Sequence, residues 1–153
     1  MSHIEYVKLD CIEPTAFLAM LNKQKIREHL IEHDFFDLAT VTVWLDTKIA
    51  IDNSPGCRVR AVLVNNQLAG WCGIQPDGNR HELAVVLDDA HWGLGRKLFR
   101  EMMHWAKELG HGSVFIHLLH TRPEYRFLQK IAKNSYKNKL LGNQFTTYEL
   151  AVE

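Results

Sequence analysis

The chain has 153 residues, of which 46% are hydrophobic and 24% are charged, a composition typical of a globular domain with its own core. We therefore expect a single domain over residues 1–153. The 18 basic and 18 acidic residues cancel to a formal net charge of zero, which argues against nucleic acid or an anionic membrane as a partner. No apolar run approaches the roughly 18 residues of a membrane span.

Three widely separated cysteines, Cys11, Cys57 and Cys72, form no paired framework. An odd number of such thiols is typical of a reducing compartment, and residues 1–10 lack the apolar segment of a secretory signal. We therefore expect a cytoplasmic protein. Cys72 is expected to be a buried structural thiol, because no histidine stands at a recognisable spacing to activate it. There is no CxxC or HExxH motif, so no metal site is expected.

The first third of the chain is predicted to be helical after a short strand at residues 5–9. Glu13-Pro14 begins a first helix, since proline is tolerated in a first turn, and Asn22 interrupts its pattern. A second helical segment follows over residues 23–31. Asp34 or Asp37 can cap a third segment. Its apolar positions at helical spacing are Val41, Trp44, Leu45 and Ile49.

The middle of the chain changes to a strand pattern after a loop at residues 52–56. Strand-like runs occupy residues 57–64, 67–74 and 81–87. Asn65-Asn66 and Pro76-Asp77-Gly78, which separate these runs, are typical turn sequences. This part of the sequence predicts an antiparallel meander.

The last third alternates helices and strands. Apolar spacing predicts a long helix over residues 94–109, and an unbroken apolar run at 114–119 predicts a buried strand. Thr121 and Glu124 match a capping box for another helix. The residues that this helix would point inward are Leu128, Ile131 and Ala132. With a final strand at 145–152, this order indicates one mixed sheet with helices packed against it.

The segment between the strand at 81–87 and the helix at 94–109 contains Gly93 and Gly95. A glycine-rich turn at a helix start exposes unpaired N–H groups at the positive end of the helix dipole, which suits an anion. From this segment alone, an ordinary tight connection that binds nothing is the alternative. The GxxxxGK[ST] motif is absent, and Leu98 replaces the third glycine of a dinucleotide fingerprint. These absences leave a diphosphate ligand that neither of these two motifs binds.

The loop Ala90-His91-Trp92-Gly93-Leu94-Gly95 resembles the Q/R-x-x-G-x-G/A pyrophosphate loop of the Gcn5-related N-acetyltransferase (GNAT) family. Residues 82–87 look like that family's fourth strand, and residues 107–110 like the end of its third helix. The resemblance implies an α/β fold with a mixed, mostly antiparallel sheet of six or seven strands and about four helices. Trp92-Gly93 and Trp44-Leu45 are most similar to the branch that acetylates ribosomal-protein N-termini and polyamines.

The resemblance implies transfer of an acetyl group from acetyl-CoA, as co-substrate, to a primary amine of a protein N-terminus, a polyamine or a small molecule. It also implies a pantetheine arm along Val85, Val86 and Leu87, with the Val86 N–H near the developing oxyanion. The backbone N–H groups expected to bind the diphosphate belong to Trp92, Gly93, Leu94, Gly95, Arg96 and Lys97.

Glu82 is expected to take the proton from the amine, because it belongs to the strand that would run beneath the acetyl group. Alternation points its neighbour His81 to the other face. His117 and His120, at the end of the next strand, are further candidates. The family's usual helix tyrosine, which protonates the leaving thiolate, falls near Leu128 or Gln129 here. The residues that would substitute for it are Tyr125 or Tyr136.

Two departures from the family pattern keep an alternative open. Ala90 stands where the loop usually has Gln or Arg, and the usual helix tyrosine is absent. A non-catalytic acyl-CoA-binding or interaction module on the same fold is that alternative, and a homodimer is one oligomeric state that the sequence leaves open. A basic helical face is either solvated or a contact for a CoA phosphate or an acidic partner. Its residues are Arg126, Lys130, Lys133 and Lys137.

Overall fold

The computed structural model describes residues 3–23, 26, 35–119, 126–140 and 143–153. Seven strands form one sheet in the order β1-β2-β3-β4-β5-β7-β6. Every neighbouring pair is antiparallel except β4 and β5, which are parallel. The strands are β1 Ile4–Val7, β2 Arg58–Val64, β3 Gln67–Asp77, β4 Arg80–Leu87, β5 Ser113–Leu119, β6 Asn134–Leu140 and β7 Asn143–Ala151. The predicted mixed, mostly antiparallel sheet is confirmed.

Four α-helices lie in the described part of the chain: α1 Pro14–Leu21, α3 Leu38–Asp52, α4 Gly95–Glu108 and α5 Arg126–Ile131. Single 3-10 segments occupy Leu9–Cys11 and Asp89–Leu94. Most of the helical segment predicted at 23–31 falls outside the described residues. None of the described helices combines the length and the apolar character needed to cross a membrane.

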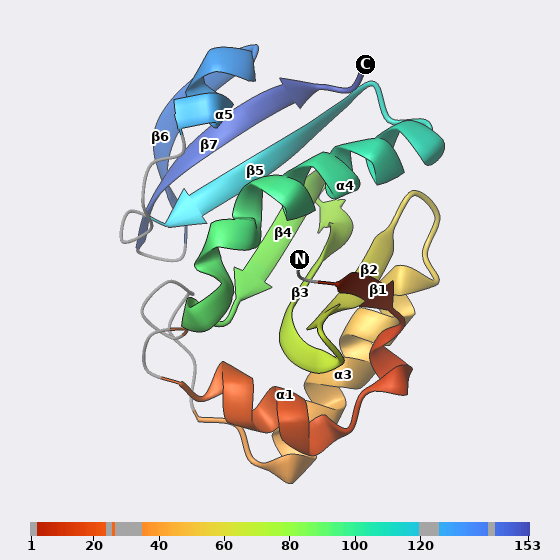
Figure 1. Cartoon of the computed structure of the whole chain (residues 1–153). Coiled ribbons are helices and arrows are strands. Elements are labelled where there is room, and N and C mark those ends of the chain that lie inside the picture. The colour runs from red at the N-terminus through yellow and green to blue at the C-terminus, as the bar shows by residue number, and fades with distance from the viewer. Residues whose placement is uncertain (1–2, 24–25, 27–34, 120–125, 141–142) are drawn as a thin grey trace.

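The sheet separates two apolar cores, with α4 across one face and α1 and α3 on the other side, towards β1–β3 (Figure 1). Leu83 and Leu87 of β4 belong to the core that α4 covers. Val86 of the same strand belongs with Trp71 of β3 to the core beneath α1 and α3. Alternate residues of β4 therefore face opposite layers, as the period of a strand requires.

The helix ends and turns follow the predicted local chemistry. Asp37, one of the two predicted caps, accepts a hydrogen bond of 2.8 Å from the Thr40 N–H, and Thr40 Oγ1 accepts one from the Asp37 N–H. This reciprocal capping box fixes the start of α3. Asn65 and Asn66 have φ values of 50° and 68°, as the two-residue turn between β2 and β3 demands.

The C-terminal part corrects the sequence prediction in three places. The strand β6 was not predicted, because its sequence NSYKNKL lacks the apolar alternation of a half-buried strand. The helix α5 ends at Ile131, so Lys133 and Lys137 do not continue its basic face, and Lys137 lies in β6. Ile131, predicted to point inward, is 51% exposed, whereas Leu128 is 1% exposed. The Thr121–Glu124 capping box lies outside the described residues.

A glycine permits the close approach of β3 to β4. A Cβ added to Gly70 would lie 2.1 Å from the backbone oxygen of Val86 and 3.0 Å from the Cα of Leu87. Both atoms belong to the backbone, which cannot move aside as the end of a flexible side chain can. The absence of a side chain at Gly70 therefore sets the path of β4 beside its last residues.

We expect Gly70→Ala to lower the free energy of unfolding by about 1–3 kcal/mol, because β4 must shift to relieve the overlap. Urea denaturation followed by circular dichroism measures this change. Gly112→Ala is the matched control, since a Cβ at Gly112 meets no atom within 4 Å. Equal stability of the two variants would contradict the close approach.

Candidate active site

The parallel contact between β4 and β5 is short. It consists of the pairs Glu82–Phe115 and Leu83–Ile116. Beyond Leu83, β4 stays paired with β3 as far as the Gly70–Leu87 pair. The predicted pantetheine strand, Val85, Val86 and Leu87, therefore continues past the last register pair with β5.

The loop after β4 is hydrogen-bonded to β3 and to the end of β4. The Asp88 N–H donates to the Ala69 oxygen at 2.7 Å, and Trp92 Nε1 donates to the Leu87 oxygen at 3.0 Å. The indole of Trp92 thus spans the loop and holds it against the end of β4. A 3-10 segment over Asp89–Leu94 replaces the simple turn that the sequence suggested.

The helix α4 begins at Gly95, one residue after the predicted start. The Gly95 N–H donates to the Trp92 oxygen, so this predicted phosphate donor already has a partner inside the loop. Arg96 and Lys97 follow in the first turn of α4, where helix N–H groups lack intrahelical acceptors. A Cβ at Gly93 would meet no atom within 4 Å, so the backbone at this point is open to a ligand.

An ion pair balances charge beside the loop. Lys23 Nζ lies 2.6 Å from Asp88 Oδ2. Burial opposes ionisation of Asp88, but hydrogen bonds from Lys23 and the Ala90 N–H outweigh it and lower the pKa of this carboxyl. The pairing offsets a negative charge that would otherwise repel a phosphate at the start of α4.

Polar side chains from neighbouring strands form a cluster on the sheet face opposite α4. His117 Nε2 of β5 lies 2.8 Å from Asp77 Oδ2 of β3 and 3.5 Å from Glu82 Oε2 of β4. On its other side, His117 Nδ1 lies 2.7 Å from the hydroxyl of Thr147, which is fully buried. Thr147 in turn donates to Asn138 Oδ1 at 3.2 Å. The sheet thereby holds Nε2 of one imidazole against two carboxylates and Nδ1 against a hydroxyl.

Helix α3 contributes a cation to the same face. Lys48 Nζ donates to Gln75 Oε1 at 2.7 Å and lies 4.7 Å from the centroid of the Trp71 ring. Burial lowers the pKa of Lys48. Because an ammonium group only donates, it directs the Gln75 oxygen to itself and leaves Gln75 Nε2 to donate to Glu82 Oε1 at 2.9 Å.

The surroundings of Glu82 in this cluster change the pKa of its carboxyl. Burial raises its pKa above the ordinary value, while the Gln75 hydrogen bond, His117 and Lys48 act in the opposite direction. Asp77 adds to the increase through like-charge repulsion. A half-buried carboxyl with a raised pKa is suited to accept a proton near neutral pH.

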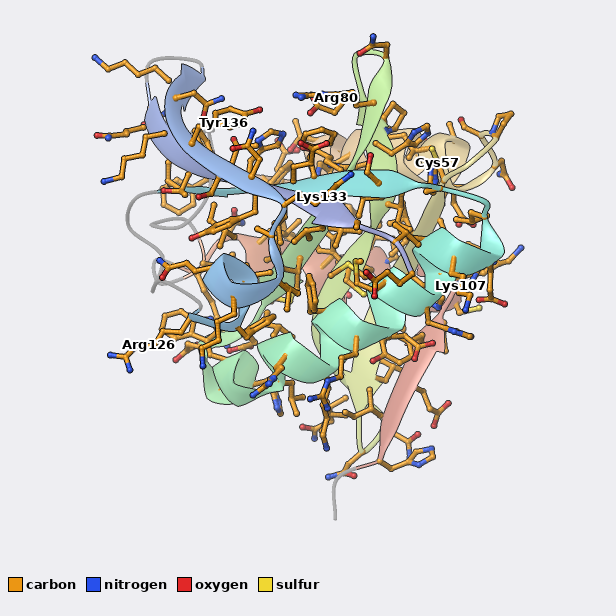
Figure 2. All side chains as sticks on the ribbon, turned by 90° about the horizontal axis from the view of Figure 1, so that it is seen from above. Cys57, Arg80, Lys107, Arg126, Lys133 and Tyr136 are labelled. Carbon is orange, nitrogen blue, oxygen red and sulfur yellow. The ribbon has the colours of Figure 1, made fainter. Side chains whose placement is uncertain are left out.

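The other predicted catalytic residues are arranged as follows. The ring of His81 packs on that of His111 with centroids 4.4 Å apart, and His81 alternates with Glu82 along β4. Tyr136 lies on β6, paired in register with Thr147, and its hydroxyl makes a hydrogen bond with Arg80 that raises the pKa of Arg80. Figure 2 shows Tyr136 and Arg80 on the side of β5 away from α4. Tyr125 and His120 lie outside the described residues.

Of the residues around Glu82, only His117 is a candidate from the sequence. Asp77 was assigned to a turn, and Gln75, Lys48 and Thr147 were not singled out. These residues come from β3, α3 and β7, and their spacing in the chain carries no motif. The one available signal was alternation, which places Glu82, Gln75 and His117 on defined faces only once the strand order is known.

The sequence profile of the acetyltransferase (GNAT) family matches residues 23–132. No curated protein matches the sequence. Among solved structures, a protein described as an acetyltransferase, yncA from Salmonella typhimurium, was determined with acetyl-CoA. It is 16% identical, with a TM-score of 0.71, and the match covers 100% of this chain and 95% of that one.

Two further structures share the fold over nearly their whole length. A ribosomal-protein-alanine N-acetyltransferase from Brucella melitensis is 17% identical with a TM-score of 0.71, covering 97% of this chain and 99% of that one. A GNAT-family protein from Bordetella pertussis is 15% identical with a TM-score of 0.78, covering 97% and 95%.

The thiols have contrasting environments. Cys72 and Cys57 are buried, whereas Cys11 is exposed. Burial raises the pKa of Cys72 far above its usual range. Because the thiolate is the nucleophile, Cys72 is unsuited to an acyl-enzyme route, in agreement with its predicted structural role.

We expect a thiol reagent to modify Cys11 rapidly in the native protein, with Cys72 and Cys57 reacting only on unfolding. Mass spectrometry after brief treatment with iodoacetamide, with and without urea, measures the difference. The variant Cys11→Ser should lose the rapid reaction. Rapid native alkylation of Cys72 would contradict its buried placement.

Proposed function

The chain belongs to the acetyltransferase (GNAT) family, and from this premise we propose that it transfers an acetyl group from acetyl-CoA to a primary amine by direct attack in a ternary complex. The acceptor is a protein N-terminus, a polyamine or a small amine. The observation that carries the proposal is the position of Glu82. This carboxyl lies where β4 meets β5, and the strand that bears it leads directly to the glycine loop.

The residues around the loop fit the diphosphate of acetyl-CoA. The first turn of α4 supplies backbone donors and the side chains of Arg96 and Lys97, and the backbone at Gly93 is open. Helix N-termini of this kind favour phosphate. The replacement of the family's usual Gln or Arg by Ala90 does not remove these backbone donors. The pantetheine arm would follow Val85, Val86 and Leu87 towards the β4–β5 contact.

The reaction requires a neutral amine beside the thioester carbon. Asp77 and Glu82 attract a cationic amine, and Glu82 takes one proton from it, directly or through water. The amine nitrogen then attacks the carbonyl, and the Val86 N–H is our candidate donor to the oxyanion. The C–S bond breaks, the nitrogen releases its second proton to water, and the CoA thiolate takes a proton from an acid. Tyr125 and Tyr136 remain our candidates for that acid.

A cytoplasmic location is part of this proposal. The three cysteines are all free thiols, which supports a reducing compartment. Acetyl-CoA as a soluble co-substrate is consistent with that location.

We expect acetyl-CoA to bind the wild-type chain and expect Gly93→Trp to weaken binding at least tenfold, because the indole would cover the phosphate donors. Isothermal titration calorimetry measures both affinities. The open surroundings of Gly93 and Gly112 make Gly112→Trp the matched control, which should bind as the wild type does. The proposal fails if the wild type shows no binding at high micromolar acetyl-CoA.

We expect Glu82→Gln to reduce kcat/KM by about 10²- to 10⁴-fold, the usual contribution of a general base. Because Glu82 acts when deprotonated and its pKa is raised, wild-type activity should fall with decreasing pH above the range of an ordinary carboxyl. The Glu82→Gln variant should lack this fall in activity at acidic pH. Thiol release over a panel of a peptide N-terminus, spermidine and a small amine measures both effects. Glu5→Gln, on the edge strand β1, is the control.

Two results would change this assignment. Undiminished turnover by Glu82→Gln would remove Glu82 as the base. In the same assay, Tyr136→Phe tests Tyr136 as the acid that protonates the CoA thiolate. Acetyl-CoA binding without turnover on any amine would contradict the transferase and favour a non-catalytic binding module.

A further inference from the structure

The cluster of Asp77, Glu82 and His117 offers three metal-ligand atoms at one point of the sheet. The imidazole Nε2 and the two carboxylate oxygens all lie within 4.8 Å of one another. In a tetrahedral zinc site with bonds of 2.0–2.2 Å, ligand atoms are about 3.4 Å apart. The distances from Nε2, 2.8 Å to Asp77 and 3.5 Å to Glu82, are near this separation. Small rotations of the two carboxylates would complete the geometry.

The outer contacts of these residues are those that orient metal ligands. His117 has a side chain only 8% exposed, and Thr147 holds its Nδ1 so that Nε2 faces the carboxylates. Gln75 holds Glu82 Oε1, which leaves Glu82 Oε2 towards the imidazole. Partners at the far side of each ligand are the usual support of a metal site.

The cluster is also accessible and charged as a cation site requires. The side chains of Asp77 and Glu82 are 32% and 23% exposed, so an ion can enter from solvent and retain water. The two negative charges of these carboxylates would balance the charge of a divalent cation. Arg80 Nη2 lies 3.4 Å from Asp77 Oδ2, a long contact at the rim that an ion would have to displace or share.

From this geometry we propose that Asp77, Glu82 and His117 bind a divalent transition-metal ion of the zinc class, and that the bound ion blocks acetyl transfer. One imidazole with two carboxylates suits Zn²⁺, whereas Mg²⁺ prefers oxygen ligands alone. The blocking role rests on the proposed function, because the ion would occupy the Glu82 oxygens that take the proton from the amine. Metal binding and proton acceptance therefore exclude one another at Glu82.

Calorimetry with ZnCl₂ on the chelator-treated, untagged chain tests the site directly. We expect one binding event that His117→Asn and Asp77→Asn each weaken more than tenfold, and no comparable event with MgCl₂. His104→Asn is the matched control, because His104 is exposed on α4 and outside the cluster. Circular dichroism melts establish that each variant is folded. Thr147→Val provides a second variant, which removes the hydrogen bonds of Thr147 to His117 and Asn138 and leaves the three proposed ligands in place.

No zinc binding, or equal binding by wild type and His117→Asn, would overturn the site. The isotherm requires no turnover, so its failure is separate from failure of the transferase. For the blocking role, we expect ZnCl₂ to inhibit thiol release and EDTA to restore it, with Asp77→Asn less sensitive relative to its own zinc-free rate. Stoichiometric zinc binding with unchanged turnover would overturn the blocking role.

Discussion

The short parallel contact between β4 and β5 is the constraint on which the rest of the site depends. Two register pairs join these strands, while β3 holds the whole length of β4 from the other side. A parallel pair needs a crossover, and α4 supplies it. The strand, the loop after it and the first turn of α4 thus form one continuous path from Glu82 to the glycine loop. Gly70 keeps that path in place by admitting the backbone of β4 at close range.

The chemistry of the site arises from unequal coverage of the sheet. The helices α1 and α3 pack mainly on β2 and β3, and the same face carries the polar cluster of Glu82, His117 and Thr147 where it extends to β5 and β7. Partial burial raises the pKa of Glu82, and Lys48 acts through Gln75 to hold its carboxylate. This arrangement suits a proton acceptor, and the same three ligand atoms suit a metal ion. The proposed proton acceptance and the proposed metal binding compete because both use the carboxylate oxygens of Glu82.

The loop shows a similar balance between local and distant groups. Its glycines and the start of α4 were evident from the sequence, yet its shape depends on Trp92, whose indole bonds back to Leu87. Its charge depends on Lys23, from the far N-terminal region, which pairs with Asp88. The strength of the proposed anion site at this helix start therefore depends on residues that sequence spacing does not connect.

The sequence by itself determined the order of the elements other than β6, the meander, an aspartate cap for α3 at Asp34 or Asp37, the apolar stripe of α4 and the glycine loop, because each depends on contacts between near neighbours in the chain. It did not determine β6, whose polar residues lack alternation, or the exposure of Ile131. Only the tertiary structure brought Asp77, Glu82 and His117 together, since the strand order that places β4 between β3 and β5 is decided by packing of the whole sheet. The spacing of residues along the chain does not indicate contacts between residues that are distant in sequence.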